Sequence, residues 1–444
     1  MDDPDTYNFN RPMSTAVAPA GARPRGVAFV ALRHREFRMF LPGTITSMMA
    51  DNIEHVITYW VLWQTFHSPV LAGFAVVSHW LPVLLFSVYI GGIADRFDCR
   101  RVIQASQGLF MAVSLTWALL FLTGTLQMWH ALVLLVLHGF AAALWMTPEQ
   151  LILHDIVGRE HLESAVRLNA TGRQIGIVLG PAVGGALLLL AGPTHGMMIN
   201  VLIYLPLSLI LMRITATGHK QGAVARKISL SDAWTAVGAA SSNRLIMAMI
   251  VMAGVASVLI GNYQPQMPEF ARDLGTTDAG LTYSALLISA GLGAVVGGIF
   301  LEASRLARAN VLGAITCAAL WGVSVAGFAM TSNYAAAMVF LFIGGFVQLA
   351  FGSMAQTVVQ LEAPPELRGR LIGAFIMAQA GLRTFSGLTI GLGGAAAGLH
   401  PALAAGGLLT LLGALAVFVY VGWSPPRPLA YSEAIVIEEN RPCC

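Results

Sequence analysis

Twelve long apolar stretches follow one another along this chain, and its Lys and Arg residues collect in alternate connections between them. A helix that crosses the hydrocarbon core of a bilayer needs about 20 apolar residues. Only 11% of the 444 residues are charged, whereas 56% are hydrophobic. Because a soluble domain carries charges on about a quarter of its residues, this composition excludes a water-exposed surface. We therefore predict an all-α membrane protein.

The apolar stretches predict twelve transmembrane helices in two sets of six. The first set covers 38–64, 70–93, 102–123, 130–156, 163–191 and 196–212. The second set covers 243–266, 277–302, 310–330, 333–360, 369–397 and 402–422. The predicted domains are an N-terminal tail (1–37), two six-helix bundles (38–212 and 243–422), a central loop between them (213–242) and a C-terminal tail (423–444).

The positive charges predict the orientation of these helices. Lys and Arg in short loops stay on the cytoplasmic side of a membrane. Arg38, Arg96, Arg159 and Arg368 lie on one side of the predicted helices, whereas the opposite connections carry only Arg272. We therefore expect both termini and the central loop in the cytoplasm.

The two halves also resemble each other. Asp95 follows the second apolar stretch as Glu302 ends the eighth, and Glu160 follows the fourth as Glu366 follows the tenth. The sequence separation from Asp95 to Glu302 and that from Glu160 to Glu366 differ by one residue. This agreement indicates an internal six-plus-six repeat with a pseudo-twofold axis along the membrane normal.

The connection after the second stretch reads GGIADRFDCRR from Gly91 to Arg101. It resembles the signature G-x-x-x-D-R-x-G-R-[KR] of the major facilitator superfamily. Asp98 replaces the usual Gly, as in the branch that contains bacterial siderophore and drug exporters. The resemblance implies a bacterial inner membrane, alternating access between the two halves, and a small-molecule substrate.

This charged connection is expected to close the cytoplasmic side. Asp95 can accept a hydrogen bond from helix N-terminal amides or an Arg across the interface of the halves. The alternative is a charge run that only sets topology. The predicted gating residues are Gly91, Asp95, Arg96, Arg100, Glu302 and Arg305.

A second motif runs through the fifth stretch, where glycines recur every four residues. Such a row lets another helix approach closely, and Pro181 removes a backbone hydrogen bond and favours a bend. The motif resembles the antiporter motif of the superfamily, which is typical of exporters; generic helix packing is the alternative. Its residues are Gly172, Gly176, Gly180, Pro181, Gly184 and Gly185, and the expected partner is the glycine-rich eighth stretch.

Ionisable residues at membrane depth are candidates for function because they are costly there. Asp51 lies 13 residues past Arg38, about 20 Å along a helix. Asp51, Glu54 and His55 share one helix face, where two carboxylates and an imidazole can exchange a proton. With Glu149 they form the predicted proton-coupling set. Direct binding of a cationic or metal-chelating solute, or a structural network with Arg, remain alternatives.

Six further residues are predicted to contact substrate because they place charge, hydrogen-bonding groups or an aromatic ring at membrane depth: Arg173, Arg383, His138, Trp60, Gln348 and Gln356. We expect Arg173 to pair with Glu149 or Asp51. His79 is a weaker candidate, because a lone buried histidine is more often structural.

No nucleotide-hydrolysis or hydrolase motif occurs, so we predict no enzyme activity. We also predict no cofactor, no metal site and no nucleic-acid partner, and a monomer in the lipid bilayer. The terminal pair Cys443–Cys444 indicates no function by itself. The predicted function is proton-coupled export (antiport) of a small amphipathic molecule, such as a siderophore-like metabolite or drug. Import of a metal chelate or organic anion, a lysolipid flippase and a non-transporting sensor are the alternatives.

Overall fold

The computed structural model describes residues 28–66, 69–218, 238, 240–261, 263, 267–274, 279–304 and 309–422. All the regular secondary structure in these ranges is helical. Seven of the described helices are long and apolar enough to cross a membrane by length and composition. α1, which carries Asp51, Glu54 and His55, is not among the seven.

The first part of the chain forms a short 3-10 helix and four α-helices: η1 (Val30–Arg33), α1 (Arg35–Phe66), α2 (Pro69–Ala94), α3 (Cys99–Thr123) and α4 (Met128–Leu211). α4 runs over three of the predicted stretches. Its backbone leaves helical geometry at Gly158 (φ 70°) and Gly192 (φ 74°), where glycine adopts a positive φ without a steric penalty. The helix continues through Pro181, and Gly192 lies between the predicted stretches 163–191 and 196–212. The bend at Pro181 stays a prediction.

The second part forms α6 (Arg244–Ile260), α7 (Met267–Asp273), α8 (Ala279–Ser304), α9 (Val311–Met330), α10 (Tyr334–Glu362), α11 (Arg368–Ile376), η3 (Met377–Gly381), α12 (Arg383–Ala397) and α13 (Leu399–Gly422). η3 is a single π-helical turn that joins α11 to α12. The stretch predicted as one helix over 369–397 therefore contains a π turn. Such turns are frequent at functional sites.

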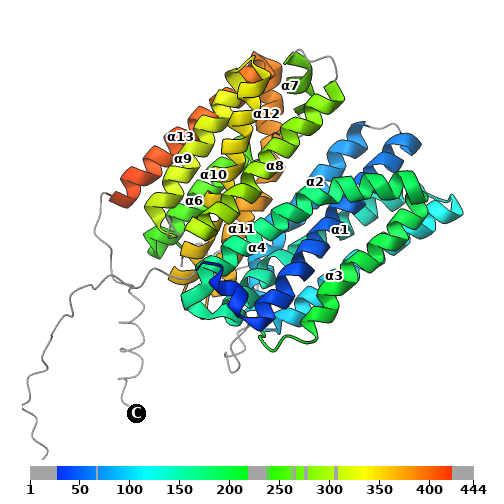
Figure 1. Ribbon diagram of the computed structural model, residues 1–444, viewed down its shortest axis with the longest axis horizontal. Helices are drawn as coiled ribbons and strands as arrows, with labels where there is room; N and C mark the ends of the chain where they lie inside the picture. Colours follow the sequence, from blue (N-terminus) through cyan, green and yellow to red (C-terminus); the bar gives the residue numbers. More distant parts are fainter. Residues whose placement is uncertain are drawn as a thin grey trace, which may run out of the picture.

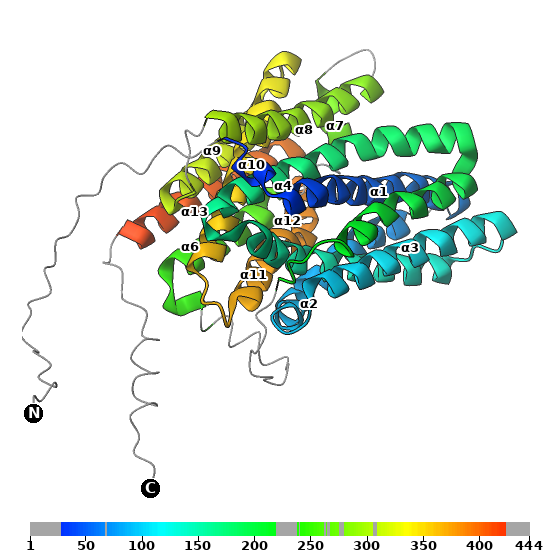
Figure 2. The ribbon, with the colours of Figure 1, turned by 60° about the horizontal axis from the view of Figure 1, so that its bottom comes forward.

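Figure 1 shows α1 to α4 gathered in one group and α6 to α13 in another. Figure 2 shows α1 lying along α4, its main partner in the first group. We call the end of the helices that carries Asp95, Arg96, Arg159 and Arg368 the arginine-rich end. Near this end α2 contacts α11, and α4 contacts α8 and α10.

Glycines bring α2 and α11 into direct backbone contact. A Cβ atom at Gly91 would overlap the carbonyl oxygen of Gly369, and one at Gly373 would overlap that of Ser87. Helices approach this closely only where side chains are absent. The two groups are therefore closed against each other at the arginine-rich end.

The glycine row of α4 packs on α1 rather than on α8. Cβ atoms at Gly172, Gly176 and Gly180 would meet Ile45, Met48 and Asn52. Gly184 also faces α1, whereas Gly185 faces open space. The prediction that this row pairs with the eighth stretch was wrong. α8 approaches another face of α4, where Gly298 lies against Thr171 and Gly291 against Val178.

Replacing Gly91 with Ala should destabilise the closed contact, because the added methyl group has no space beside Gly369. Overpacking of this kind costs about 1–3 kcal/mol. We expect Gly91→Ala to lower the thermal midpoint of the purified protein. The matched control is Gly108→Ala in α3, where a Cβ has no neighbour within 4 Å and should slightly stabilise the helix. Equal midpoints for the two variants would contradict this contact.

Candidate functional site

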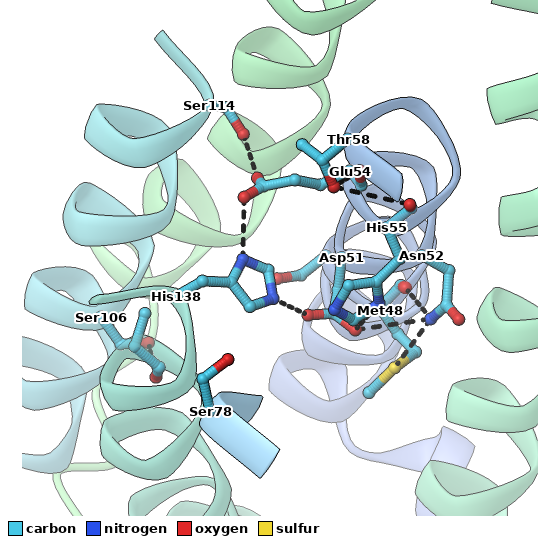
Figure 3. A network of polar contacts seen from close by, with 12 residues as sticks. Met48, Asp51, Asn52, Glu54, His55, Thr58, Ser78, Ser106, Ser114 and His138 are labelled. Carbon is cyan, nitrogen blue, oxygen red and sulfur yellow. Dashed lines mark hydrogen bonds and ion pairs between the residues drawn. The ribbon is translucent and has the colours of Figure 1, made fainter. Parts of the chain in front are cut away.

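The most densely charged cluster inside the helices centres on His138 of α4. Its Nε2 lies 2.9 Å from Asp51 Oδ1 and its Nδ1 lies 2.8 Å from Glu54 Oε1. Figure 3 shows the ring held between the two carboxylates of α1. The side chains of His138, Asp51 and Glu54 are 4%, 10% and 2% exposed. Sequence reasoning placed His138 with the substrate residues, but the structure joins it to the predicted proton-coupling residues.

Further side chains orient this cluster. Ser114 of α3 donates a hydrogen bond to Glu54 Oε2. Asn200, near the end of α4, in turn donates to Ser114 at 3.3 Å. Phe110 packs edge-on against the His138 ring, with centroids 4.9 Å apart. Glu54 and His138 are therefore oriented by side chains of α3, which the last part of α4 supports through Asn200.

The contacts of His138 require two hydrogens. A neutral imidazole carries one N–H and one lone pair. Both ring nitrogens face carboxylate oxygens at hydrogen-bond distance, so either the imidazole is protonated or one carboxyl is. Loss of one proton would set a lone pair against a carboxylate oxygen and break one contact. The geometry of the cluster therefore depends on how many protons it holds.

Two more histidines border the same cluster. The ring of His55 lies 4.9 Å from those of His79 and His138, measured between centroids. His79, on α2, lies 5.4 Å from His138 in the same measure. His55 Nδ1 is 3.9 Å from Asp51 Oδ2, which is beyond hydrogen-bond distance. Sequence spacing alone did not indicate that three helices bring these histidines together.

A second buried charge pair lies nearby on α4. Arg173 Nη1 is 2.6 Å from Glu149 Oε2, and Glu149 is fully buried. The guanidinium also lies over the Trp145 ring, 5.1 Å from its centroid. Of the two partners predicted for Arg173, the structure selects Glu149.

Arg383, the first residue of α12, has no ion pair or hydrogen bond to its guanidinium among the described residues. It lies over the Trp80 ring of α2, 5.5 Å from the centroid. Arg383 is half-buried and its Nε is buried; a guanidinium without an anion is costly at such a position, so it favours an anionic ligand. It also lies immediately after the π turn η3, at the interface of the two groups.

The other predicted substrate residues are dispersed. Gln356 of α10 donates to Gln150 of α4 and so links the two groups. Gln348 is half-buried on α10. Trp60 is 52% exposed and takes no part in the His138 cluster.

Asp95 joins the two groups at the arginine-rich end. Its Oδ1 accepts a hydrogen bond from the Gly369 amide at 2.7 Å, in the first turn of α11, where a helix favours negative charge. Burial raises the pKa of the Asp95 carboxyl to about 6, although this amide and the positive charge of Arg370 act in the opposite direction. Arg96 has one buried guanidinium nitrogen that lacks a hydrogen bond to any described residue.

Arg100 does not reach across the interface. Its guanidinium bonds to Asp98 and to the carbonyl of Ile214, both in its own group. Asp98 also accepts from the Arg100 amide and so caps α3. In this arrangement the Asp that replaces the usual Gly holds Arg100 within its own group, and the gating role of Arg100 stays a prediction.

Glu302 of α8 makes the corresponding contact in the other half. It pairs with Arg167 Nη1 at 3.0 Å and accepts from Ser164 and from the Phe29 amide. Sequence reasoning missed Arg167 and Ser164, although an Arg within an apolar stretch was a usable signal. Arg305, also predicted to gate, lies outside the described residues.

The comparison with known proteins identifies the family. The family described as "Transmembrane secretion effector", a branch of the major facilitator superfamily, matches residues 26–422. The chain belongs to the major facilitator superfamily. Members are transporters and not enzymes, so this facilitator is a multi-pass membrane protein of the transporter class.

Its relatives include exporters. The multidrug efflux pump Tap of Mycolicibacterium fortuitum is 25% identical over 397 residues, which cover 86% of the facilitator and 95% of the pump. The enterobactin exporter EntS of Shigella boydii serotype 18 is 24% identical, with 81% and 84% covered. Among solved structures, FucP in the outward conformation matches with a TM-score of 0.67 at 13% identity, covering 88% of this chain and 99% of FucP. That similarity supports the fold.

The closed end of the facilitator should respond to pH through Asp95. Its raised pKa means that protonation stabilises the closed contact, fully below its ordinary value of 3.8 and no longer once the pH rises through about 6. Asp95→Asn keeps the acceptor oxygen but cannot ionise. We expect the thermal midpoints of wild type and Asp95→Asn to agree below pH 3.8, and the variant to become the more stable one as the pH rises, with the full difference reached above about pH 6. A difference that does not change with pH would contradict this.

Removing the Glu302 charge should destabilise the facilitator, because Arg167 would keep only the partly exposed Glu163 carboxylate as a described anionic partner. Breaking a buried pair outright costs about 3 kcal/mol or more, and Glu163 should make the loss here smaller than that. The control is Asp273→Asn, which disrupts an exposed pair with Arg272 worth less than about 1 kcal/mol. Denaturant titration in detergent should show the larger loss for Glu302→Gln. Equal losses would mean that the Glu302 contacts do not hold the end closed.

Proposed function

We propose that this facilitator is a proton-coupled exporter (antiporter) of a small amphipathic molecule. Two six-helix bundles, 38–212 and 243–422, would alternate access to a central site. If α4 is counted as three segments divided at Gly158 and Gly192, α11 to α12 as one, and the short η1 and α7 are left out, the described helices would supply the twelve proposed membrane-spanning segments. The tails 1–37 and 423–444 and the central loop 213–242 complete the proposed organisation.

We place the arginine-rich end in the cytoplasm of a bacterial cell, in its inner membrane, because positive loops remain on that side. Both termini then lie inside. The contacts of Asp95 with Gly369 and of Glu302 with Arg167 close this end. In that orientation the arrangement described above is the state closed to the cytoplasm. We further propose that the transporter acts as a monomer.

The observation that carries the proposal is the position of His138 between Asp51 and Glu54. Three buried ionisable groups share hydrogens there, so a change of one proton changes the contacts between α1 and α4. Protons that enter from outside would neutralise a carboxylate and release the substrate. Loss of protons to the cytoplasm would reset the site. Glu149, bound to Arg173, is the second proposed proton carrier.

The chemistry around Arg383 supports a substrate that carries an anionic group beside an apolar or aromatic body. The guanidinium lacks a described anionic partner and lies over Trp80. A siderophore-like metabolite or a drug with an acidic group would supply that anion. Export is supported by the relatives that are named as an efflux pump and an enterobactin exporter. The same Arg383 also favours the second candidate, uptake of an organic anion or metal chelate.

The test of direction and substrate is untargeted mass spectrometry of cells and medium from the native host and a deletion strain, each with and without a protonophore. A metabolite retained in the deletion strain and in protonophore-treated wild type supports gradient-driven export. A metabolite that accumulates in the medium of the deletion strain supports uptake and overturns export.

Replacing Asp51 with Asn or Glu54 with Gln should abolish gradient-driven export while sparing folding, because each amide keeps its size but cannot release a proton. The measurement is transport in proteoliposomes with an imposed pH gradient. Asp273→Asn, a neutralised carboxylate outside the cluster, is the control and should transport as wild type. Unchanged transport in both cluster variants would refute proton coupling here.

A further inference from the structure

We propose that Asp51, His55, His79 and His138 form a binding site for a divalent transition-metal ion of the zinc class. One ligand atom from each residue lies within 4.8 Å of those of the other three. The inference goes beyond the proposed function, because it depends neither on the direction of transport nor on proton coupling.

The four ligands come from three helices of the first group. Asp51 and His55 are one turn apart on α1, while His79 lies on α2 and His138 on α4. All four belong to the part of the chain that packs as one group. A metal ion bound there would therefore fasten α2 and α4 to α1.

The distances suit small movements into coordination. Zinc binds imidazole nitrogen and carboxylate oxygen at about 2.0–2.1 Å, which sets tetrahedral ligands about 3.3 Å apart. His138 Nε2 and Asp51 Oδ1 are already 2.9 Å apart. His55 Nδ1 is 3.9 Å from the other Asp51 oxygen. Side-chain rotation of His55 and His79 would bring the remaining ligand atoms to bonding distance.

Two of the histidines carry a ring nitrogen that has no hydrogen bond to the described residues. His79 Nδ1 is buried and has no hydrogen bond to the described residues. His55 Nδ1 lies beyond hydrogen-bond distance from its nearest carboxylate. Leaving the buried Nδ1 of His79 unpaired is costly. A metal ion would satisfy both lone pairs.

The third histidine has the environment of a metal ligand. His138 Nδ1 lies 2.8 Å from Glu54, and Ser114 holds the other oxygen of that carboxylate. Metal-binding histidines commonly donate their second N–H to a carboxylate, which sets the ring orientation. Glu54 would thus keep the hydrogen on Nδ1 and direct Nε2 toward the ion. The ion would take the place of the hydrogen between Nε2 and Asp51.

The ligand set selects the type of cation. Three imidazoles favour zinc and its transition-metal neighbours, whereas magnesium and calcium require oxygen ligands. The two carboxylates, Asp51 and Glu54, balance the charge of a divalent ion. His55 is 21% exposed, and Tyr59, one turn along α1, is 37% exposed. These exposed edges give an ion access to the buried side of the cluster.

The test is zinc binding to the purified full-length chain, prepared without a polyhistidine tag and with Cys443→Ser and Cys444→Ser to remove the adjacent terminal thiols. We expect one zinc ion per chain by calorimetry and no competition from excess magnesium. His79→Asn should weaken binding by about tenfold or more. The matched control is His161→Asn, which changes a histidine of the separate His34–His161 pair and should bind zinc as the parent does.

Zinc-edge X-ray absorption of the parent protein tests the ligands without any ligand substitution. Three imidazole nitrogens at about 2.0 Å would support the site. Absence of stoichiometric zinc, a loss of affinity in His161→Asn but not in His79→Asn, or a spectrum without imidazole scattering would overturn it. Stoichiometric zinc binding by the purified protein, together with no export in the transport assays, would support the metal site while overturning the proposed function.

Discussion

The cost of placing charge in an apolar surrounding organises this transporter. Most of the buried ionisable groups described above pair with an opposite charge, and several of these pairs link different helices. His138 of α4 contacts two carboxylates of α1 at hydrogen-bond distance. Glu149 and Arg173 form an ion pair within α4. Glu302 binds Arg167 across the two groups. Arg383 is left for a ligand, because no described anion reaches it. The candidate site therefore contains two kinds of buried or half-buried group: carboxylates paired through His138, and Arg383, which has no described anionic partner.

Close helix packing provides the second constraint. Glycines at Gly91 and Gly369 let α2 and α11 touch through their backbones, and Asp95 then reaches the N-terminal amides of α11. Without that approach the carboxylate would be buried with no donor. The closed contact therefore depends both on the close backbone packing of α2 and α11 and on the hydrogen bond that Asp95 accepts. The glycine row of α4 serves the internal packing of the first group, since it lies on α1 rather than across the interface.

Much of the architecture was predictable, because hydrophobic length and charge distribution respond to the membrane itself. The spacing of Asp51, Glu54 and His55 placed them on one helix face, and the Asp95 motif indicated the family. The pairing of Arg173 with Glu149 was one of two predicted choices. The roles of Arg100 and His138 were not predictable, because each depends on which neighbour lies closest in space: Asp98 for Arg100 and two carboxylates for His138.

The sequence by itself determined that the chain is a helical membrane protein of the major facilitator superfamily, since composition and local motifs do not depend on how helices pack. Only the tertiary structure decided which buried groups lie within hydrogen-bond distance of one another and which histidines converge. His55, His79 and His138 lie far apart in sequence, and their convergence depends on the packing of α1, α2 and α4. Spacing along one helix gives the direction of a side chain, but contacts between helices require their relative positions, which no local pattern encodes.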